Sequence, residues 1–180
     1  MVNDMHSALE HGSGHLESIA YLGLGANLGD PVQQLIDAKN YLSKLPNCKI
    51  LNASAYYLTS PVGYQSQPDF VNCVVALETT LSAEVLLQKT QKIENLLGRT
   101  RVLGNQNAPR LIDIDILLFG DVQLNTADLS IPHPRIAERL FVLLPLSELL
   151  HNQAHRLLGS VSSLLSDNQF EGQSVFRLVM

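Results

Sequence analysis

Two aspartates on one expected strand are the residues of this chain best suited to carry chemistry. The stretch 109–120 alternates polar and apolar residues with the period of two that is typical of a β-strand. Asp113 and Asp115 therefore lie side by side on one face. The opposite face is apolar and carries Ile112, Ile114, Ile116 and Leu118.

Carboxylates this close repel each other, and a shared divalent cation relieves the repulsion. Hard cations such as Mg²⁺ take carboxylate oxygens and keep room for water and for substrate phosphates. Arg110, just before the pair, can bind a phosphate with its planar guanidinium. The stretch predicts a metal-and-phosphate site. The alternative is an amphipathic edge strand whose two aspartates are merely solvated.

The elements around this strand predict one α+β domain. In order they are a strand at 19–24, a helix from an Asp30 cap to about Lys44, strands at 48–58 and 72–79, a helix between Ser82 and Gly98, and the aspartate strand. The order β-α-β-β-α-β indicates a ferredoxin-like core. After it we expect a hairpin partner at 122–124, short helices at 141–150 and 161–165, and a final strand-like segment. Residues 1–17 lack periodicity and are expected to form a disordered extension to a single domain over 18–180.

Composition limits the classes of function. The chain has 180 residues, 46% of them hydrophobic, which suffices for one real core. Its net charge of -5 argues against a general nucleic-acid binder. No apolar run reaches membrane-spanning length, and the first residues lack the regions of a secretory signal. Cys48 and Cys73 are expected to be buried thiols in a reducing compartment. We therefore expect a cytoplasmic protein, acting as a monomer, without membrane or nucleic-acid partners.

Glycines and loops give weaker signals. Gly23, Gly25 and Gly29 have the spacing G-x-G-x-x-x-G, which is not the dinucleotide fingerprint, so we interpret them as a tight strand-to-helix turn. The polar loop from Arg99 to Arg110 is long enough to be a lid that is mobile without ligand. His133 stands between two prolines, and a surface role and a site role are equally open.

Five blocks of sequence occur in order between about Ile19 and about Leu150. They are YLGLGANLGDP, TSPVGYQSQPDFVN, QKIENLLGRTR, PRLIDIDILLFG and IPHPRIAERLFVLLPL. With these blocks the chain resembles the 6-hydroxymethyl-7,8-dihydropterin pyrophosphokinases of folate biosynthesis. The resemblance implies transfer of the β,γ-pyrophosphoryl group of ATP to the pterin hydroxymethyl oxygen, with release of AMP. A relative that binds pterin or nucleotide without transfer is the alternative.

The resemblance also implies a role for particular residues. Asp113 and Asp115 would hold two Mg²⁺ ions, and Arg99 and Arg110 would be catalytic. ATP would be bound by Gln91, Glu94, Arg99, Arg101, Arg110, Ile116, Ser130, His133 and Arg139. The pterin would be bound by Thr59, Ser60, Val62, Gly63, Phe70, Asn72, Asp113 and Phe141. The chain departs from the family pattern in the lid, where VLGNQNA replaces a stretch that often contains Trp and basic residues.

Overall fold

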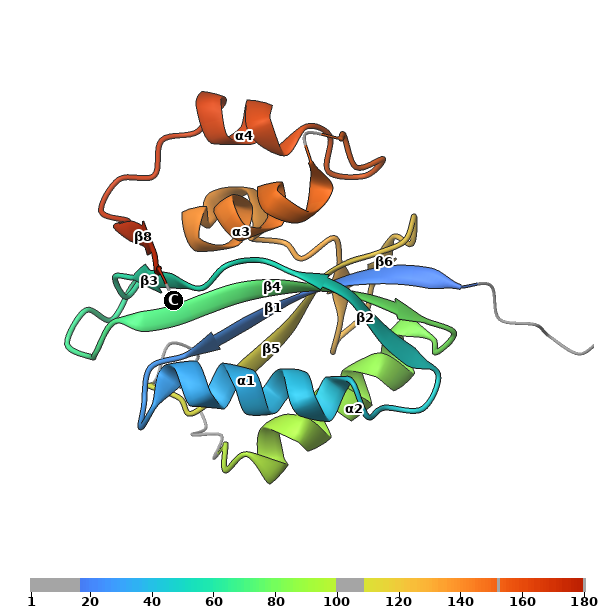
Figure 1. The fold of residues 1–180 in the computed structure, drawn as a ribbon. Coiled ribbons are helices and arrows are strands. Elements are labelled where there is room, and N and C mark those ends of the chain that lie inside the picture. Colours follow the sequence, from blue (N-terminus) through green and yellow to red (C-terminus); the bar gives the residue numbers. More distant parts are fainter. Residues whose placement is uncertain (1–16, 100–108, 152, 180) are drawn as a thin grey trace, which may run out of the picture.

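The main sheet separates two layers of helices in the computed structural model, which describes residues 17–99, 109–151 and 153–179 (Figure 1). Helices α1 and α2 cover one face of the sheet, and α3, with α4 beyond it, covers the other. The expected N-terminal extension, Glu17 excepted, and Arg101 with most of the expected lid lie outside the described residues. The helices are α1 (Pro31–Leu42), α2 (Ala83–Leu96), α3 (Leu140–Leu150) and α4 (Val161–Asp167), with a short 3-10 helix η1 (Ile136–Glu138). The strands are β1 (Ser18–Ala26), β2 (Cys48–Ala53), β3 (Tyr57–Thr59), β4 (Phe70–Thr79), β5 (Asp113–Phe119), β6 (Leu124–Asn125), β7 (Ser130–Ile131) and β8 (Val175–Arg177).

The order of the strands confirms the predicted fold class. The main sheet runs β5-β1-β4-β3-β8, with β2 also paired to β4, and its neighbouring strands are antiparallel. Each of the two crossovers, through α1 and through α2, skips one strand, which is the ferredoxin-like arrangement. None of the described helices is long and apolar enough to cross a bilayer.

Local signals for the helix ends are confirmed. The Asp30 side chain accepts a hydrogen bond from the N–H of Gln33, at 3.1 Å, and Pro31 occupies the first position of α1. Ser82 caps α2 in the same way. Gly98 follows α2 with a φ of +87°, the left-handed conformation that lets glycine end a helix.

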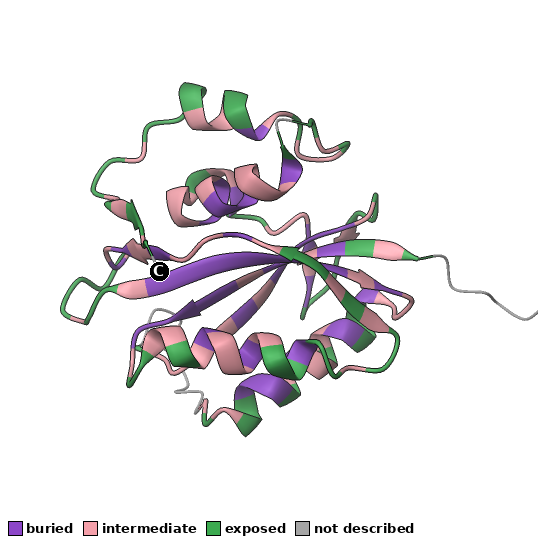
Figure 2. Cartoon of the chain, in the orientation of Figure 1, coloured by how far each residue is buried: buried purple, intermediate pink, exposed green. Residues whose placement is uncertain are grey.

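The buried apolar residues form two clusters, one on each face of the sheet. The central strand β4 is buried along most of its length (Figure 2). Ile112, Ile114 and Ile116 pack toward α1 and α2, as their period of two predicted. Leu118, expected beside them, belongs instead to the cluster under α3. The reason is a register shift against β1 at Tyr21, where β5 carries one extra residue and its alternation changes phase.

The predicted single strand over 48–58 is wrong, because β2 and β3 are separated by a break. Ser54 lies in this break, where its N–H donates to the Val74 carbonyl and its hydroxyl accepts a hydrogen bond from the Val74 N–H, both at 2.9 Å. The N–H of Ala55 instead donates to the Glu148 carboxylate on α3, at 2.8 Å. A contact between distant segments therefore replaces the ladder at this point. The expected hairpin partner at 122–124 is also displaced, since β6 pairs with β7 in a separate small sheet.

Replacing Glu148 with Gln should destabilise the fold at neutral pH. Its carboxylate also accepts hydrogen bonds from the Tyr57 hydroxyl, at 2.6 Å, and from Arg177 of β8, at 3.2 Å. Burial raises the pKa of Glu148, but these donors and the Ala55 N–H outweigh it, so the pKa lies below its ordinary value of 4.5. We expect Glu148→Gln to cost about 1–2 kcal/mol at pH 7.

The loss of stability caused by Glu148→Gln should become smaller as the pH is lowered. A depressed carboxyl pKa contributes stability above the ordinary pKa and loses it as pH falls through the folded pKa. Denaturant unfolding at pH 7 and at about pH 3 therefore checks the prediction, with the largest difference between variant and parent at pH 7. Glu138→Gln is the matched control, because Glu138 makes an exposed ion pair with Arg135. Equal losses in the two variants would contradict the prediction.

Candidate active site

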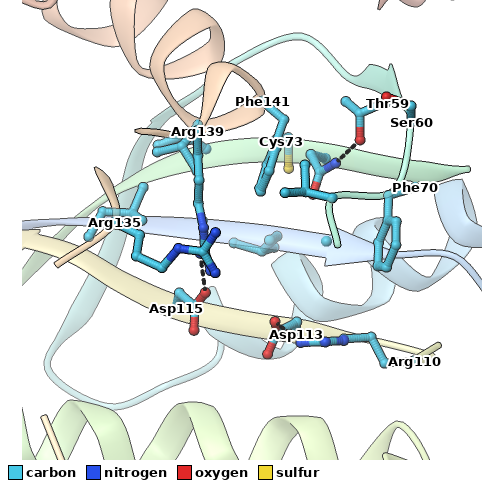
Figure 3. A pocket seen from close by; sticks show the side chains of 18 of the residues that line it. Thr59, Ser60, Phe70, Cys73, Arg110, Asp113, Asp115, Arg135, Arg139 and Phe141 are labelled. Atoms are coloured by element: carbon cyan, nitrogen blue, oxygen red, sulfur yellow. Dashed lines mark hydrogen bonds and ion pairs between the residues drawn. The ribbon is translucent and has the colours of Figure 1, made fainter. Parts of the chain in front are cut away.

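Strand β5 presents Asp113 and Asp115 to the side of the sheet that faces α3 (Figure 3). In the ladder with β1, Asp113 lies opposite Gly25 and Asp115 opposite Gly23. The side chains are 21% and 40% exposed, so neither is sealed in the core. The expected edge position is real, since β5 ends the sheet, but both carboxylates border cavities and contact cations.

Guanidinium groups surround the two carboxylates. Arg99 Nη1 lies 2.6 Å from Asp113 Oδ1, and Arg110 contacts the other oxygen of Asp113. Arg139 Nη1 lies 3.5 Å from Asp115 Oδ2. These three cations come from the end of α2, the approach to β5 and the start of α3. The fold therefore gathers three always-charged groups that can bind phosphate oxygens.

The electrostatics of Asp115 favour an added cation. Burial, together with the charge of Asp113, raises the pKa of Asp115 to about 6, although Arg139 acts in the opposite direction.

Nearby His133 differs, because burial and the charges of Arg139 and Arg135 lower its pKa to about 4. His133 is thus neutral at pH 7, and its Nδ1 accepts a hydrogen bond from the Arg135 N–H, at 3.1 Å. Its Nε2 faces Asp115 at 4.0 Å.

Of the two cavities that Asp115 lines, the one with more empty space, the larger cavity, lies over the centre of the sheet, beneath the start of α3. It has about 820 Å³ of empty space, part of it open to solvent. Asn72 stands on its floor, and the Asn72 amide nitrogen donates to the Thr59 hydroxyl at 2.7 Å. Arg110, Asp113, Asp115 and Arg139 line the same cavity. The expected pterin residues found in its wall are Thr59, Ser60, Val62, Phe70, Asn72, Asp113 and Phe141.

A second cavity lies on the other side of Asp115. Ile116, Ser130 and His133, three residues expected to bind ATP, line it together with Leu87 and residues 126–129. Asp115 lines both cavities. Because Asp115 borders both cavities, its carboxylate can act on a chemical group that is transferred from a ligand in one cavity to a ligand in the other.

Not all of the expected site residues are found in the walls of the two cavities. Gln91, Glu94, Gly63 and Arg99 line neither cavity, although Arg99 contacts Asp113. Arg101 falls outside the described residues. Glu94 is 2% exposed, forms an ion pair with Arg99 and accepts a hydrogen bond from the Ile114 N–H, at 2.7 Å. Its placement joins α2 to β5 and orients Arg99.

Sequence reasoning missed the role of Gly23 and Gly25. Both lie within β1 and line the larger cavity, so the interpretation of a strand-to-helix turn applies to Gly29 alone. A Cβ on Gly25 would lie 2.5 Å from Asn72 Oδ1. The usable signal was glycine at period two inside a strand, which marks a close approach of other groups.

Asn27 was missed as well. Its side chain is 3% exposed, and its amide nitrogen donates to Gln67 and to the Pro68 carbonyl, both at 3.0 Å. Its carbonyl oxygen accepts from the Arg110 N–H at 2.8 Å. Asn27 therefore links the 59–70 loop to Arg110, which lies shortly before the two aspartates in the chain.

The donor set fits Mg²⁺. Asp113 and Asp115 supply hard oxygen ligands, and the cavities on either side leave space for phosphates and water. Within the described ranges, no group of three or more His, Cys, Asp or Glu side chains could enclose an ion alone. Mg²⁺ characteristically uses one or two carboxylates and completes its shell with water and substrate phosphates.

An α+β fold with paired carboxylates beside three guanidinium groups suits an enzyme that acts on phosphate groups. The family model described as 7,8-dihydro-6-hydroxymethylpterin-pyrophosphokinase matches residues 21–151. A 2-amino-4-hydroxy-6-hydroxymethyldihydropteridine pyrophosphokinase of Bacillus subtilis is 44% identical over 134 residues, covering 74% of this chain and 79% of the relative. The Haemophilus influenzae protein of the same name is 42% identical over 130 residues, which cover 72% and 80% of the two chains.

The chain belongs to the 7,8-dihydro-6-hydroxymethylpterin-pyrophosphokinase family and is an enzyme of that class. Folic acid synthesis protein FOL1 of Dictyostelium discoideum is 37% identical over 89% of this chain and 24% of its own length. The fold resembles the Plasmodium falciparum HPPK-DHPS structure with pteroate, with a TM-score of 0.67 and 18% identity. That match covers 84% of this chain but 42% of the solved chain, so this chain spans less than half of it. The expected family is confirmed.

Proposed function

We propose that this chain transfers the β,γ-pyrophosphoryl group of ATP to the hydroxymethyl oxygen of 6-hydroxymethyl-7,8-dihydropterin, giving AMP and the pterin diphosphate. The observation that carries the proposal is the position of Asp115, between two cavities and beside Asp113. Family membership supports the same reaction. Phosphoryl transfer depends mostly on positioning and charge neutralisation, which this arrangement offers.

The larger cavity suits the pterin. A flat heteroaromatic ring binds well against aromatic faces, and Phe70 and Phe141 enter this cavity from β4 and α3 (Figure 3). Asn72 offers an amide to the donor and acceptor edge of the ring, and its contact with Thr59 fixes its orientation. The pterin hydroxymethyl group would then point toward Asp113 and Asp115.

The second cavity suits the nucleotide. Ile116 gives an apolar surface for the adenine, and Ser130 and the neutral His133 can hydrogen-bond to ATP. The triphosphate would extend from there past Asp115 toward Arg99, Arg110 and Arg139. Gln91 and Arg101 remain part of the proposed ATP site, as does Glu94 through its contact with Arg99.

In the transfer, the hydroxymethyl oxygen bonds to the β phosphorus and its proton passes to water. The bond from the β phosphorus to the α,β-bridging oxygen breaks, and AMP leaves. Two Mg²⁺ ions, held by Asp113 and Asp115, would supply charge neutralisation along the phosphates. Arg99 and Arg110 are the proposed catalytic residues, because they lie beside Asp113 and can move onto the phosphates when metal replaces them.

The proposal includes a monomeric, cytoplasmic protein. Residues of one chain line both cavities, so a partner subunit is not needed to complete the site. Cys48 and Cys73 are free thiols, which suits a reducing compartment that also supplies ATP. Sedimentation at assay concentration tests the monomer.

Incubation with ATP, Mg²⁺ and 6-hydroxymethyl-7,8-dihydropterin tests the reaction. AMP and pterin diphosphate in equal amounts are the expected products. ADP would indicate transfer of a single phosphoryl group and would contradict the proposal. Binding of both substrates without AMP would favour the alternative, a relative that holds pterin and nucleotide without transfer.

Asn72→Ala should weaken pterin binding more than ATP binding. The variant removes the amide that would pair with the ring edge, and each unpaired group costs about 1–3 kcal/mol. Titration of each ligand separately measures the two affinities. Because Asn72 lies on β4 in the middle of the sheet, an equal loss of both affinities would indicate a folding defect instead.

A further inference from the structure

The C-terminal segment beyond the family match reaches back to the proposed site. Strand β8 pairs with β3 (Figure 1). The residues just before β8 contact both walls of the larger cavity. On one wall, the Ser174 N–H donates to the Ser60 hydroxyl, and the Ser60 N–H donates to the Ser174 carbonyl, at 2.9 and 3.0 Å. Gln173, the preceding residue, reaches the other wall.

The Gln173 side chain holds the backbone on both sides of Arg139. Its amide nitrogen donates to the Glu138 carbonyl at 2.8 Å, and its amide oxygen accepts from the Leu140 N–H at 2.9 Å. One planar amide thus joins the last residue of η1 to the first residue of α3.

This junction lacks a cap of its own. Arg139 precedes α3 in an extended conformation, with φ of -111° and ψ of 103°, and its side chain makes no capping hydrogen bond. The first N–H groups of a helix have no partner within the helix. Gln173 supplies a partner for the Leu140 N–H from 33 positions along the chain, leaving the Arg139 side chain to enter the cavity.

The Arg139 side chain depends on this backbone position. Its guanidinium contacts Asp115 at 3.5 Å and lies 5.6 Å from the centroid of the Phe141 ring. A short displacement of the junction would change both contacts, and small misplacements of charged groups are costly in transfer reactions.

We propose that Gln173 is a positioning residue that sets Arg139 against the transferred phosphates. The inference rests on the proposed function, and it adds a residue outside positions 21–151, where the family match ends. Gln173 does not touch substrate; its effect passes through the backbone of residues 138–140.

Gln173→Met tests this, because methionine keeps the length of the side chain and removes both hydrogen bonds. We expect kcat for AMP formation to fall about tenfold, with the dissociation constant of the pterin within about twofold of the parent. Gln153→Met is the matched control, an exposed glutamine in the same part of the chain, and should keep the parental kcat. If Gln173→Met fails to fold, Gln173→Asn carries the same test, since its shorter amide cannot span both groups.

A double-mutant cycle separates positioning from general destabilisation. In an Arg139→Ala background, Gln173→Met should cause no further loss of kcat, because its effect passes through Arg139. Independent, additive losses would overturn the inference, as would an unchanged kcat or a pterin affinity that falls with kcat. If the parent chain itself makes no AMP, the proposed function has failed, which this design distinguishes from failure of the Gln173 role alone.

Discussion

Asp113→Ala and Asp115→Ala are each expected to lower turnover at least ~10²-fold at saturating Mg²⁺. Each variant removes a carboxylate that would hold a metal ion on the transferred phosphates. It also removes one ion-pair partner, that of Arg99 and Arg110 in one case and that of Arg139 in the other. Steady-state AMP formation across a Mg²⁺ titration measures the effect.

Asp121→Ala is the matched control for these variants. Asp121 lies two residues after the end of β5 and forms an ion pair with an arginine, Arg156, at 3.0 Å, but it lines neither cavity. Its replacement should leave turnover near the parental value. Near-normal turnover of Asp113→Ala or Asp115→Ala would show that the metal assignment is wrong.

Asp115→Asn should stabilise the metal-free protein at neutral pH. Because the pKa of Asp115 rises in the fold from 3.8 to about 6, the native state holds this proton more tightly than the unfolded chain. The free energy of unfolding of the parent therefore falls as pH rises from 3.8 to about 6. The asparagine variant keeps its stability over this range, because its amide does not ionise. Denaturant unfolding in a chelator should show a stabler variant at pH 7 and no gain below about pH 4. A variant less stable than the parent at pH 7 would contradict this.

Gly25→Ala is expected to weaken pterin binding by ~10²-fold while ATP affinity stays within about threefold. The new methyl group would lie 2.5 Å from Asn72 Oδ1, so Asn72 has to turn away from its hydrogen bond with Thr59. Gly25 also lies between Asn72 and Asp113 across the sheet, where the cavity has its floor. Ligand titrations with pterin and with ATP measure the two affinities.

Gly23→Ala provides the comparison within the same strand. A methyl group there would meet the end of the Leu117 side chain at 3.3 Å, and a flexible side chain can shift. Its effect on pterin affinity should therefore be clearly smaller than that of Gly25→Ala. Equal effects would mean that added volume in the cavity, and not the displacement of Asn72, weakens binding.

The sequence by itself determined the features that depend on near neighbours in the chain. The period of two placed Asp113 and Asp115 together on one face of β5. The caps at Asp30 and Ser82 and the stop at Gly98 follow from hydrogen bonds and backbone angles within a few residues. The order of elements was enough for the ferredoxin-like core, and the ordered blocks were enough for the family.

Tertiary structure alone decided the features that join distant segments. Glu148 of α3 satisfies the N–H of Ala55 and so divides the expected second strand, a contact between residues 93 positions apart. Glu94, which the family resemblance assigned to the ATP site, is buried and accepts a hydrogen bond from the Ile114 N–H at the sheet edge. Gly25 became part of the site through Asn72 and Asp113 on its two neighbouring strands. Such contacts have no period or local motif in the sequence, because what sets them is the need of each buried polar group for a partner, wherever in the chain that partner lies.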